Sequence, residues 1–516
     1  MTRAPAEFAA KVEELLHASA DGPGAVVAVL EDGQEIFASA YGMANINNSV
    51  PMARDTIIRI GSQTKQFTVL LILMLEAEGK LSLSDRVQEH LPYVPQLEHD
   101  ITLGHLAQNA SGYRDHLESM IYAGLSIVTP STRQAARDVI SQQDRLNFAP
   151  GTAMIYSNAG FFMLSEIIEK VEGKSFNAVL KERITDPLGM KDTALMPRDA
   201  TVMKRLAAHY CRREGEWSTQ GWGLDLGGEG GMISTLDDMI IWLKNLSDPK
   251  VGTPQMYERM ATPTVFANGE TGFYGMGLVT DTYRGRRAVG HGGTVAGGKS
   301  ESTRYVDDGL GIIIIANHDQ ISPFAIARRI ADAYFETEIP APIDLVPGRY
   351  REVEGNDVIE IAKGENGPNF LSAGGTVSFD FAHPGGAKPE RAVTDLVLTP
   401  AADGTIKARF CGTPRTYAPL PEGCKAVKPL TGRYRNAAQN LDVEIWGDCN
   451  TAQLRLRSDL GAFAAELVAV DSDLWLMLPS GATLRPGQAW TAMIQVTSEG
   501  FAFNTERMKH LDFKKS

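Results

Sequence analysis

The sequence predicts an α/β domain followed by two antiparallel β-barrel domains. Strand-like segments stand at both ends of residues 1–336, with helical segments between them. This order is typical of a sheet that is built from the first and last parts of one domain and covered by helices. Beyond residue 345 the helical periodicity gives way to short alternating runs separated by glycine and proline, which is typical of all-β structure. Within that tail the tetrapeptide GRYR occurs twice.

The first part opens with a hairpin pattern. Residues 25–30 are apolar, a short polar turn follows, and residues 35–40 form a second strand-like run. A helix is expected over 63–78, because its apolar residues cover nearly the whole circumference and such a helix is buried on most sides. Gly79 is the expected glycine at its C-terminal end. Further helices are expected over 160–171, 176–183, 236–246 and 323–335, and further strands over 287–290, 300–306 and 310–316.

The tail divides into a linker and two repeated units. Residues 337–345 contain two prolines and are typical of a linker. The tetrapeptide at 348–351 recurs at 432–435, 84 residues later, and an alternating strand pattern follows each copy. Two copies indicate two related barrels, which we place at 346–418 and 419–516, and two are too few for a solenoid. The alternative is that two unrelated strands share four residues by chance.

Composition excludes several classes of function. The chain has 516 residues, a net charge of -13 and a pI of about 5.4, which argues against nucleic acid as a partner because phosphate binding needs a basic face. The N-terminus is too charged for a secretory segment, and no apolar run reaches membrane-spanning length. We therefore expect a cytoplasmic protein with no membrane association. The four cysteines are scattered and no metal-ligand spacing occurs, so we expect no disulfide framework, no metal and no cofactor.

Ser62 and Lys65 form the pair with the clearest chemical meaning. A serine hydroxyl is a weak nucleophile and needs a base in contact, and residues three apart on a helix share one face. The start of a helix also favours negative charge that develops near the serine. Burial in an apolar helix lowers the pKa of a lysine, so that Lys65 can act as the base. The alternative is a helix cap with a snorkelling lysine.

Two further motifs follow in the same part of the chain. Tyr156 lies two residues before Asn158; a phenol beside cationic groups can return a proton to a leaving amine, and the asparagine can orient a substrate amide. His291 precedes two glycines and Thr294, and the glycines allow a close backbone approach. The N–H groups of Thr294 and Ser62 can then form an oxyanion hole, worth about 3 kcal/mol per donor. Each of these motifs taken alone is more often structural.

Taken in order, the motifs resemble those of the serine β-lactamase and penicillin-recognising superfamily, in its class C-like branch that contains D-stereospecific peptidases. The resemblance covers residues 10–335. The stretches that carry it, in chain order, are 60–68, 78–85, 101–106, 109–112, 148–151, 156–158, 230–235 and 290–293. That family often has a lysine where this chain has His291. The histidine is similar to the aminopeptidase and esterase-like branches and speaks against classical β-lactamase activity.

The resemblance implies a β-lactamase-like catalytic domain, with an antiparallel sheet and helices, and an acyl-enzyme mechanism on Ser62. Lys65, coupled to Tyr156, takes the serine proton. The substrate carbonyl lies between the N–H groups of Ser62 and Thr294, and Tyr156 passes a proton to the leaving amine. His291 lies across the cleft, where it polarises Tyr156 or contacts the substrate.

The two barrels behind the catalytic domain extend the resemblance to D-aminopeptidases, serine enzymes that release N-terminal D-amino acids from short peptides and amides. In those enzymes a loop of the last barrel enters the active site. The matching loop here is 477–488, with Gly481 as the expected substrate-binding residue. This loop has no acid to meet the substrate ammonium. Asp225 and Glu229 of the catalytic domain are the alternatives.

Other classes of function stay open. A carboxylesterase on the same scaffold would use the same nucleophile. A DD-peptidase of the cell wall is opposed by the missing signal sequence. A non-catalytic protein that binds β-lactams or peptidoglycan fragments is opposed by the intact Ser62, Lys65 and Tyr156. The resemblance also implies β-lactams as inhibitors and a homodimer, whereas the preferred side chain, its chirality and the natural substrate are left open.

Overall fold

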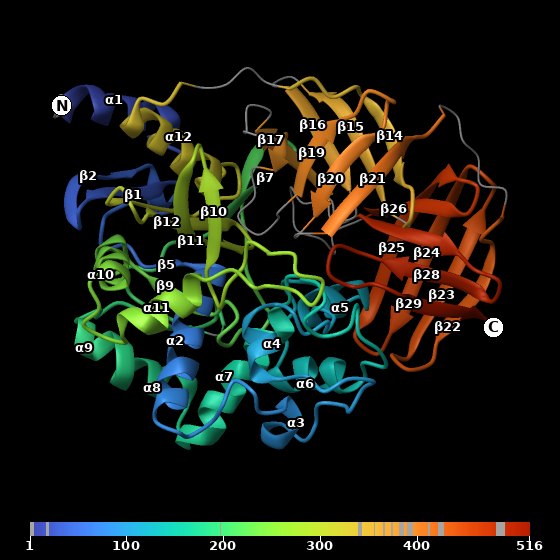
Figure 1. Ribbon diagram of the computed structural model, residues 1–516, viewed down its shortest axis with the longest axis horizontal. Coiled ribbons are helices and arrows are strands. Elements are labelled where there is room, and N and C mark those ends of the chain that lie inside the picture. The colour runs from blue at the N-terminus through green and yellow to red at the C-terminus, as the bar shows by residue number, and fades with distance from the viewer. Residues whose placement is uncertain are drawn as a thin grey trace.

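Figure 1 shows the computed structural model of the chain, with the α/β domain on the left and the β tail on the right. The structure describes residues 5–16, 20–196, 198–338, 343–355, 357–364, 367–372, 375–380, 386–389, 396–410, 413–421, 428–480 and 491–516.

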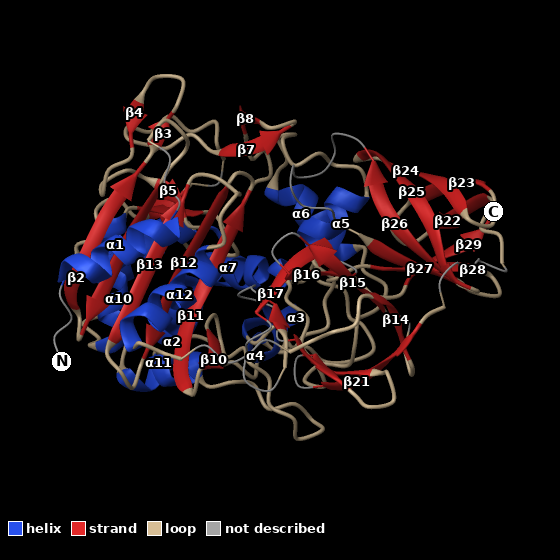
Figure 2. Ribbon diagram, turned by 90° about the horizontal axis from the view of Figure 1, so that it is seen from above, coloured by secondary structure: helices blue, strands red, loops and turns tan. Residues whose placement is uncertain are grey.

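An antiparallel sheet of six strands forms the centre of the α/β domain (Figure 2). Strands from both ends of the domain lie side by side in it, as predicted. Across the sheet the strands are β10 (Val279–Tyr283), β11 (Arg286–Val295), β12 (Gly298–Tyr305), β13 (Leu310–Ala316), β1 (Ala25–Glu31) and β2 (Gln34–Tyr41). Asp32 and Gly33, between β1 and β2, have φ angles of 48° and 74°. Positive φ at both positions is the hairpin turn that matches the twist of paired strands.

Both faces of this sheet are apolar, which explains the continuous apolar runs of its central strands. Val27 and its partner Ile314 lie in one buried cluster with side chains of α1 (Pro5–Leu16) and α12 (Pro323–Phe335). Ala28 and its partner Ile313 lie in the other cluster, on the opposite face. Figure 1 shows α1 and α12 above the sheet and α2, α10 and α11 below it.

The long segment between β2 and β10 supplies the helical half of the domain. Its helices are α2 (Thr64–Ala77), α3 (Val87–His90), α4 (Leu103–Ala107), α5 (His116–Tyr122), α6 (Arg133–Ser141), α7 (Asn158–Glu172), α8 (Phe176–Leu180), α9 (Asp186–Leu188), α10 (Leu236–Ser247) and α11 (Pro254–Ala261). The short strands are β3 (Met43–Asn45), β4 (Val50–Pro51), β5 (Ile58–Arg59), β6 (Ala194–Leu195), β7 (Tyr210–Arg213), β8 (Glu216–Thr219) and β9 (Met232–Ser234). The helix expected over 63–78 is α2, and Gly79 follows it with a φ of 69°.

The tail forms two eight-stranded antiparallel units. The first comprises β14 (Gly348–Glu352), β15 (Val358–Gly364), β16 (Gly367–Ser372), β17 (Gly375–Asp380), β18 (Lys388–Pro389), β19 (Leu396–Pro400), β20 (Ile406–Phe410) and β21 (Thr413–Pro419). The second comprises β22 (Gly432–Asn436), β23 (Leu441–Gly447), β24 (Thr451–Ser458), β25 (Gly461–Asp471), β26 (Leu474–Ser480), β27 (Ala492–Val496), β28 (Gly500–Asn504) and β29 (Leu511–Lys515). The second is a closed barrel, whereas the first is a sheet whose two ends meet in an isolated bridge between Ala387 and Leu398.

The repeated tetrapeptide begins both units in the same way. It forms β14 in the first unit and β22 in the second, and each strand pairs with the strand that follows it. The hydroxyl of Tyr350 donates to the carbonyl of Val346 at 2.8 Å, and the hydroxyl of Tyr434 donates to the carbonyl of Leu430 at 3.0 Å. The two copies therefore have one local structure, in which the tyrosine fixes the entry of the chain into its first strand.

The closed barrel packs directly on the catalytic half through α5. Tyr122 of α5 is buried in the barrel core, with its ring centroid 5.4 Å from that of Phe463 and 5.1 Å from that of Phe503. Gly124 has a φ of 101°, and a Cβ there would lie 2.4 Å from the amide nitrogen of Ala462. Because only glycine allows that approach, the barrel and the segment after α5 are in backbone contact.

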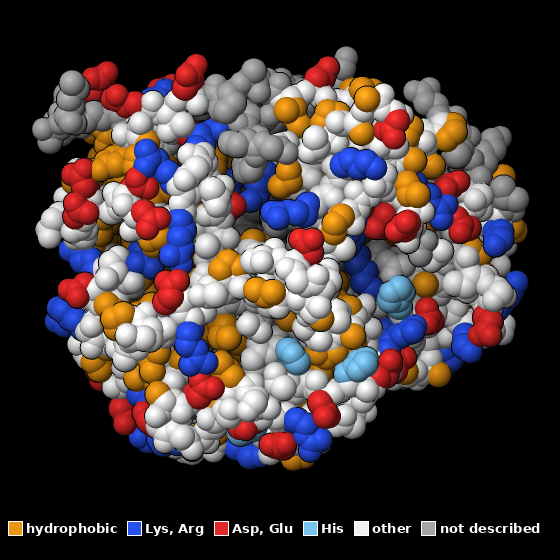
Figure 3. Space-filling view, viewed as in Figure 1, with side chains coloured by type: hydrophobic (Ala, Val, Ile, Leu, Met, Phe, Trp, Pro, Cys, Tyr) orange, Lys and Arg blue, Asp and Glu red, His pale blue; other side chains and the backbone are white. Residues whose placement is uncertain are grey.

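The face seen in Figure 1 mixes acidic, basic and apolar side chains (Figure 3). In the described ranges, none of the helices has the length and apolar character needed to cross a membrane. Cys211, which is buried, and Cys449, which is exposed, are both free thiols.

Candidate active site

Ser62 lies in a tight 3-10 turn, η1 (Gly61–Gln63), between β5 and α2. Gly61 has a φ of 56°, and a Cβ there would lie 2.9 Å from the amide nitrogen of Thr294. A Cβ on Gly293 would lie 1.9 Å from the carbonyl oxygen of Ile60. Two glycines thus let the serine turn touch the end of β11, and the backbone at Ser62 comes to lie beside that at Thr294. Such a pair of neighbouring amides is the usual construction of an oxyanion hole.

Lys65 is fully buried in the first turn of α2 and points at the serine. Its Nζ lies 3.1 Å from Oγ of Ser62 and 2.8 Å from Oδ1 of Asn158, and it also bonds to the carbonyl of Glu229. Burial lowers the pKa of Lys65, because a desolvated ammonium loses its hydration. A neutral amine has two N–H donors and one lone pair. The two carbonyl-type oxygens can take the donors, which leaves the lone pair for the hydroxyl of Ser62.

Asn158 connects Lys65 to a buried carboxylate that sequence analysis missed. Its Nδ2 and its backbone N–H both donate to Oδ2 of Asp115, at 2.8 and 2.6 Å. Asp115 is also the N-cap of α5, because its Oδ1 accepts from the N–H of Glu118 at 2.8 Å. Both ends of the Asn158 amide are therefore occupied, and the side chain positions Lys65. The sequence contains Asp115 three residues after the matched 109–112 stretch, which is the only local signal for it.

Tyr156 lies against Lys65, whose Nζ is 4.8 Å from the ring centroid. The tyrosine is 7% exposed, and its hydroxyl has no hydrogen-bond partner in the described part of the chain. Burial raises the pKa of Tyr156 above its usual range, and the hydroxyl of Ser62 and the charge of Arg507 act against this rise. A buried hydroxyl next to that of Ser62 is suited to a proton transfer with a bound substrate.

His291 is fully buried, and its ring lies near that of Tyr156. Its Nδ1 lies 2.6 Å from the carbonyl of Gly292, so Nδ1 carries the proton and Nε2 accepts from the hydroxyl of Tyr274 at 3.1 Å. Burial lowers the pKa of His291 to about 3. The ring centroids of His291 and Tyr156 are 6.0 Å apart. The histidine is thus a neutral imidazole with both nitrogens occupied.

The two acids considered as alternative partners of a substrate ammonium, Asp225 and Glu229, both contact protein groups. Glu229 is fully buried, and its Oε1 accepts from the N–H of Gly227. Asp225 forms an ion pair with Arg198 at 3.0 Å. Gly481, and with it most of the loop expected at 477–488, lies outside the described residues.

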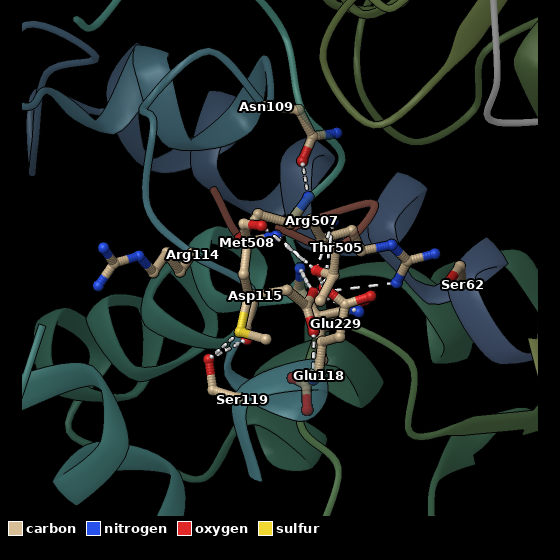
Figure 4. A network of polar contacts seen from close by, with 12 residues as sticks. Ser62, Asn109, Arg114, Asp115, Glu118, Ser119, Glu229, Thr505, Arg507 and Met508 are labelled. Atoms are coloured by element: carbon tan, nitrogen blue, oxygen red, sulfur yellow. Dashed lines mark hydrogen bonds and ion pairs between the residues drawn. The ribbon is translucent and has the colours of Figure 1, made fainter. Parts of the chain in front are cut away.

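A different turn of the closed barrel reaches the site (Figure 4). Residues 505–510 join β28 to β29, and Arg507 of this turn lies with its guanidinium carbon 5.1 Å from the centroid of the Tyr156 ring. Its Nη1 lies 3.9 Å from Oδ2 of Asp115. In Figure 4 the Arg507 side chain extends toward Ser62. Nothing in the local sequence marks Arg507, because its neighbours in space lie hundreds of residues earlier in the chain.

The described residues contain no group of three or more histidine, cysteine or acidic side chains arranged to hold a metal ion.

The antiparallel sheet between two layers of helices, with a serine and a lysine at the start of the central helix, defines a β-lactamase-like protein. Residues 8–335 match the family model described as Beta-lactamase. The chain belongs to the beta-lactamase family.

Sequence similarity to named proteins extends over the β tail as well. The chain is 28% identical to a D-aminopeptidase of Cereibacter sphaeroides (strain ATCC 17029 / ATH 2.4.9) over 498 residues, which cover 93% of this chain and 92% of that protein. It is 31% identical to a D-aminopeptidase of Gluconobacter oxydans over 338 residues, which cover 63% of this chain and 62% of the relative.

Solved structures share the fold at lower identity. An octameric penicillin-binding protein homologue from Pyrococcus abyssi aligns with a TM-score of 0.58 and 20% identity, covering 97% of this chain and 98% of that chain. A D-amino acid amidase from Ochrobactrum anthropi SV3, solved with D-phenylalanine, aligns with a TM-score of 0.54 and 23% identity, covering 64% of this chain and all of that one.

Proposed function

We propose that this chain is a serine hydrolase that releases N-terminal D-amino acids from short peptides and amides through an acyl-Ser62 intermediate. The observation that carries the proposal is the 3.1 Å contact between Oγ of Ser62 and Nζ of the fully buried Lys65. The preference for D-residues is supported by the relatives named D-aminopeptidase, one of which matches over nearly the whole chain.

Acylation follows from the geometry of the site. Lys65 takes the proton of Ser62 while Oγ attacks the substrate carbonyl, and the oxyanion accepts from the N–H groups of Ser62 and Thr294. Tyr156 gives its proton to the leaving nitrogen and regains one from Lys65. The amine then departs, and Ser62 carries the acyl group.

Deacylation uses the same groups in the reverse direction. Lys65 and Tyr156 together accept a proton from water, which attacks the ester carbonyl. Oγ of Ser62 regains its proton as the acid leaves. His291 acts in this scheme as a positioning residue, because it accepts from Tyr274 and neither ring nitrogen is left for the substrate.

Small peptides and amides are the proposed substrates, and β-lactams are proposed inhibitors because their ring amide can acylate Ser62. A homodimer is proposed on the resemblance alone, and a cytoplasmic location is proposed because no apolar run of the sequence reaches membrane-spanning length.

The test is turnover of D-alanine p-nitroanilide, its L-enantiomer and a p-nitrophenyl ester by the wild type and by Ser62→Ala. We expect cleavage of the D-anilide in preference to the L-anilide, and loss of this activity in Ser62→Ala. Ser247→Ala is the matched control, because Ser247 and Lys250 have the same spacing but lie at the end of α10. Cleavage of the ester alone would instead identify a carboxylesterase on this scaffold.

A further inference from the structure

The turn that carries Arg507 is held rigidly against the catalytic domain. The carboxylate of Glu118 accepts from the hydroxyl of Thr505 and from the N–H of Arg507. The side chain of Asn147 bonds to both flanks of the turn, at the carbonyl of Arg507 (3.0 Å) and the N–H of Lys509 (2.7 Å). A turn with this many contacts to its surroundings presents its side chain in a defined place.

The guanidinium of Arg507 has donors to spare. It forms no hydrogen bond with any described residue, and its single ion-pair contact, to Asp115 at 3.9 Å, is too long for one. The carboxylate of Asp115 already accepts from Asn158 and from the N–H of Glu118. The Arg507 side chain is 17% exposed. A partly exposed cation with free donors next to a nucleophile is therefore available to a ligand.

The charge and the position of Arg507 indicate which chemical group it can bind. A guanidinium binds a carboxylate through two parallel N–H donors and repels an ammonium. It lies over the ring of Tyr156, the residue that in the proposed mechanism protonates the leaving nitrogen. In a dipeptide the leaving nitrogen and the C-terminal carboxylate are attached to the same Cα atom. A leaving amino acid therefore brings its carboxylate to the vicinity of Arg507.

We propose that Arg507 binds the carboxylate of the leaving group, and that the enzyme prefers dipeptides with a free C-terminal carboxylate to the corresponding amides. This inference rests on the proposed function, because it assigns the leaving-group side of that reaction. It makes Arg507 a specificity residue that the C-terminal barrel supplies to the catalytic domain.

The experiment compares kcat/KM for D-alanyl-glycine and D-alanyl-glycinamide, which differ only in the terminal carboxylate. Hydrogen bonds to charged groups predict a preference for the acid of about tenfold or more in the wild type. Arg507→Gln is expected to bring the ratio of acid to amide near one, mainly through KM for the acid. Arg507→Lys is expected to give an intermediate ratio, because it keeps the charge but loses the planar fork.

Arg145→Gln is the matched control. Arg145 pairs with Asp512 of the barrel at 2.7 Å, so it is a cation of the same domain contact. Its substitution should leave the wild-type ratio unchanged. Melting temperatures of the variants show whether the turn stays docked.

Equal rates for acid and amide in the wild type, or a preference that survives in Arg507→Gln, would overturn the assignment. If the wild type cleaves D-alanine p-nitroanilide but neither dipeptide, the proposed function stands, and if it cleaves none of the three substrates, the proposed function fails. In both cases the assignment of Arg507 is decided by calorimetric binding of the dipeptides to Ser62→Ala. Tighter binding of the acid, lost on adding Arg507→Gln, supports it, whereas equal or undetectable binding of both dipeptides overturns it.

Discussion

The turn at Ser62 and the turn at 505–510 reach the same point of the molecule from opposite ends of the chain. The first is local: Ser62 in η1 and Lys65 in the first turn of α2 lie three residues apart in the sequence. The second is distant: Arg507 meets Tyr156 only because the barrel docks on α5. In the proposed mechanism the first turn supplies the reacting groups, and the second adds a charge beside them. The two proposals together place reactivity and selectivity in separate domains.

The largest expected effect falls on the local turn. Lys65→Met keeps an unbranched side chain but removes the base. We expect kcat/KM to fall at least 100-fold, since general-base catalysis is worth roughly 100- to 10,000-fold. The rate with D-alanine p-nitroanilide measures this loss. A Lys65→Met enzyme with near wild-type activity would mean that another group takes the proton of Ser62.

The second-largest effect is expected from disrupting the contact between the Ser62 turn and β11. Gly61→Ala places a methyl group 2.9 Å from the amide nitrogen of Thr294 at a φ of 56°. Backbone strain of this kind costs about 1–3 kcal/mol, and displacement of one oxyanion donor costs about 100- to 1000-fold in kcat. The melting temperature measures the loss of stability, and kcat measures the loss of the oxyanion donor. Gly79→Ala, at a φ of 69° with open space around it, is the control for strain alone.

Removal of the buried charge at Asp115 tests the support of Lys65. Asp115→Asn keeps the shape but leaves two donors of Asn158 facing a neutral amide. Hydrogen bonds to a charged group are worth about 1.5–3 kcal/mol, so we expect lower stability and a drop in kcat. Chemical unfolding and steady-state kinetics provide the readouts. Unchanged values for both would show that Asp115 does not hold Asn158 in place.

The smallest expected effect is a shift in the pH dependence of kcat/KM. It tests whether the turn at 505–510 acts on the turn at Ser62. Burial lowers the pKa of Lys65, and the charge of Arg507 lowers it further. The neutral amine is the base, so kcat/KM should rise with pH through the lowered pKa and level off below the ordinary lysine value of about 10.4. Arg507→Gln should move this limb to higher pH. If the rise of kcat/KM occurs at the same pH in Arg507→Gln and in the wild type, the charge of Arg507 does not lower the pKa of Lys65.

A feature of this protein can be predicted from the sequence when the contacts that determine it are close in the chain. The α/β domain, its antiparallel sheet and the all-β tail were predictable, because strand alternation and the apolar circumference of α2 are local patterns. The grouping of Ser62, Lys65, Tyr156 and Asn158 rested on three short motifs in order, and the structure brings all four together. Their catalytic roles stay predictions.

The rest of the site is set by tertiary contacts that no local pattern reports. His291 was expected across the cleft, in contact with Tyr156 or the substrate, and the structure adds that it is fully buried with Nε2 against the hydroxyl of Tyr274. Glu229 was an alternative partner for the substrate ammonium, yet it is fully buried. Most of the barrel loop expected at 477–488 lies outside the described residues, and the turn at 505–510 was not expected. The closure of the two tail units also differs, although both begin with the same tetrapeptide.

The most direct test of the central claim is mass spectrometry of the enzyme quenched during turnover of a D-alanine ester or amide. The account predicts an added D-alanyl group on the peptide that contains Ser62, lost in Ser62→Ala. A β-lactam should label the same peptide. Turnover of D-substrates by Ser62→Ala, or an acyl group on another residue, would contradict the assignment of Ser62 as the nucleophile.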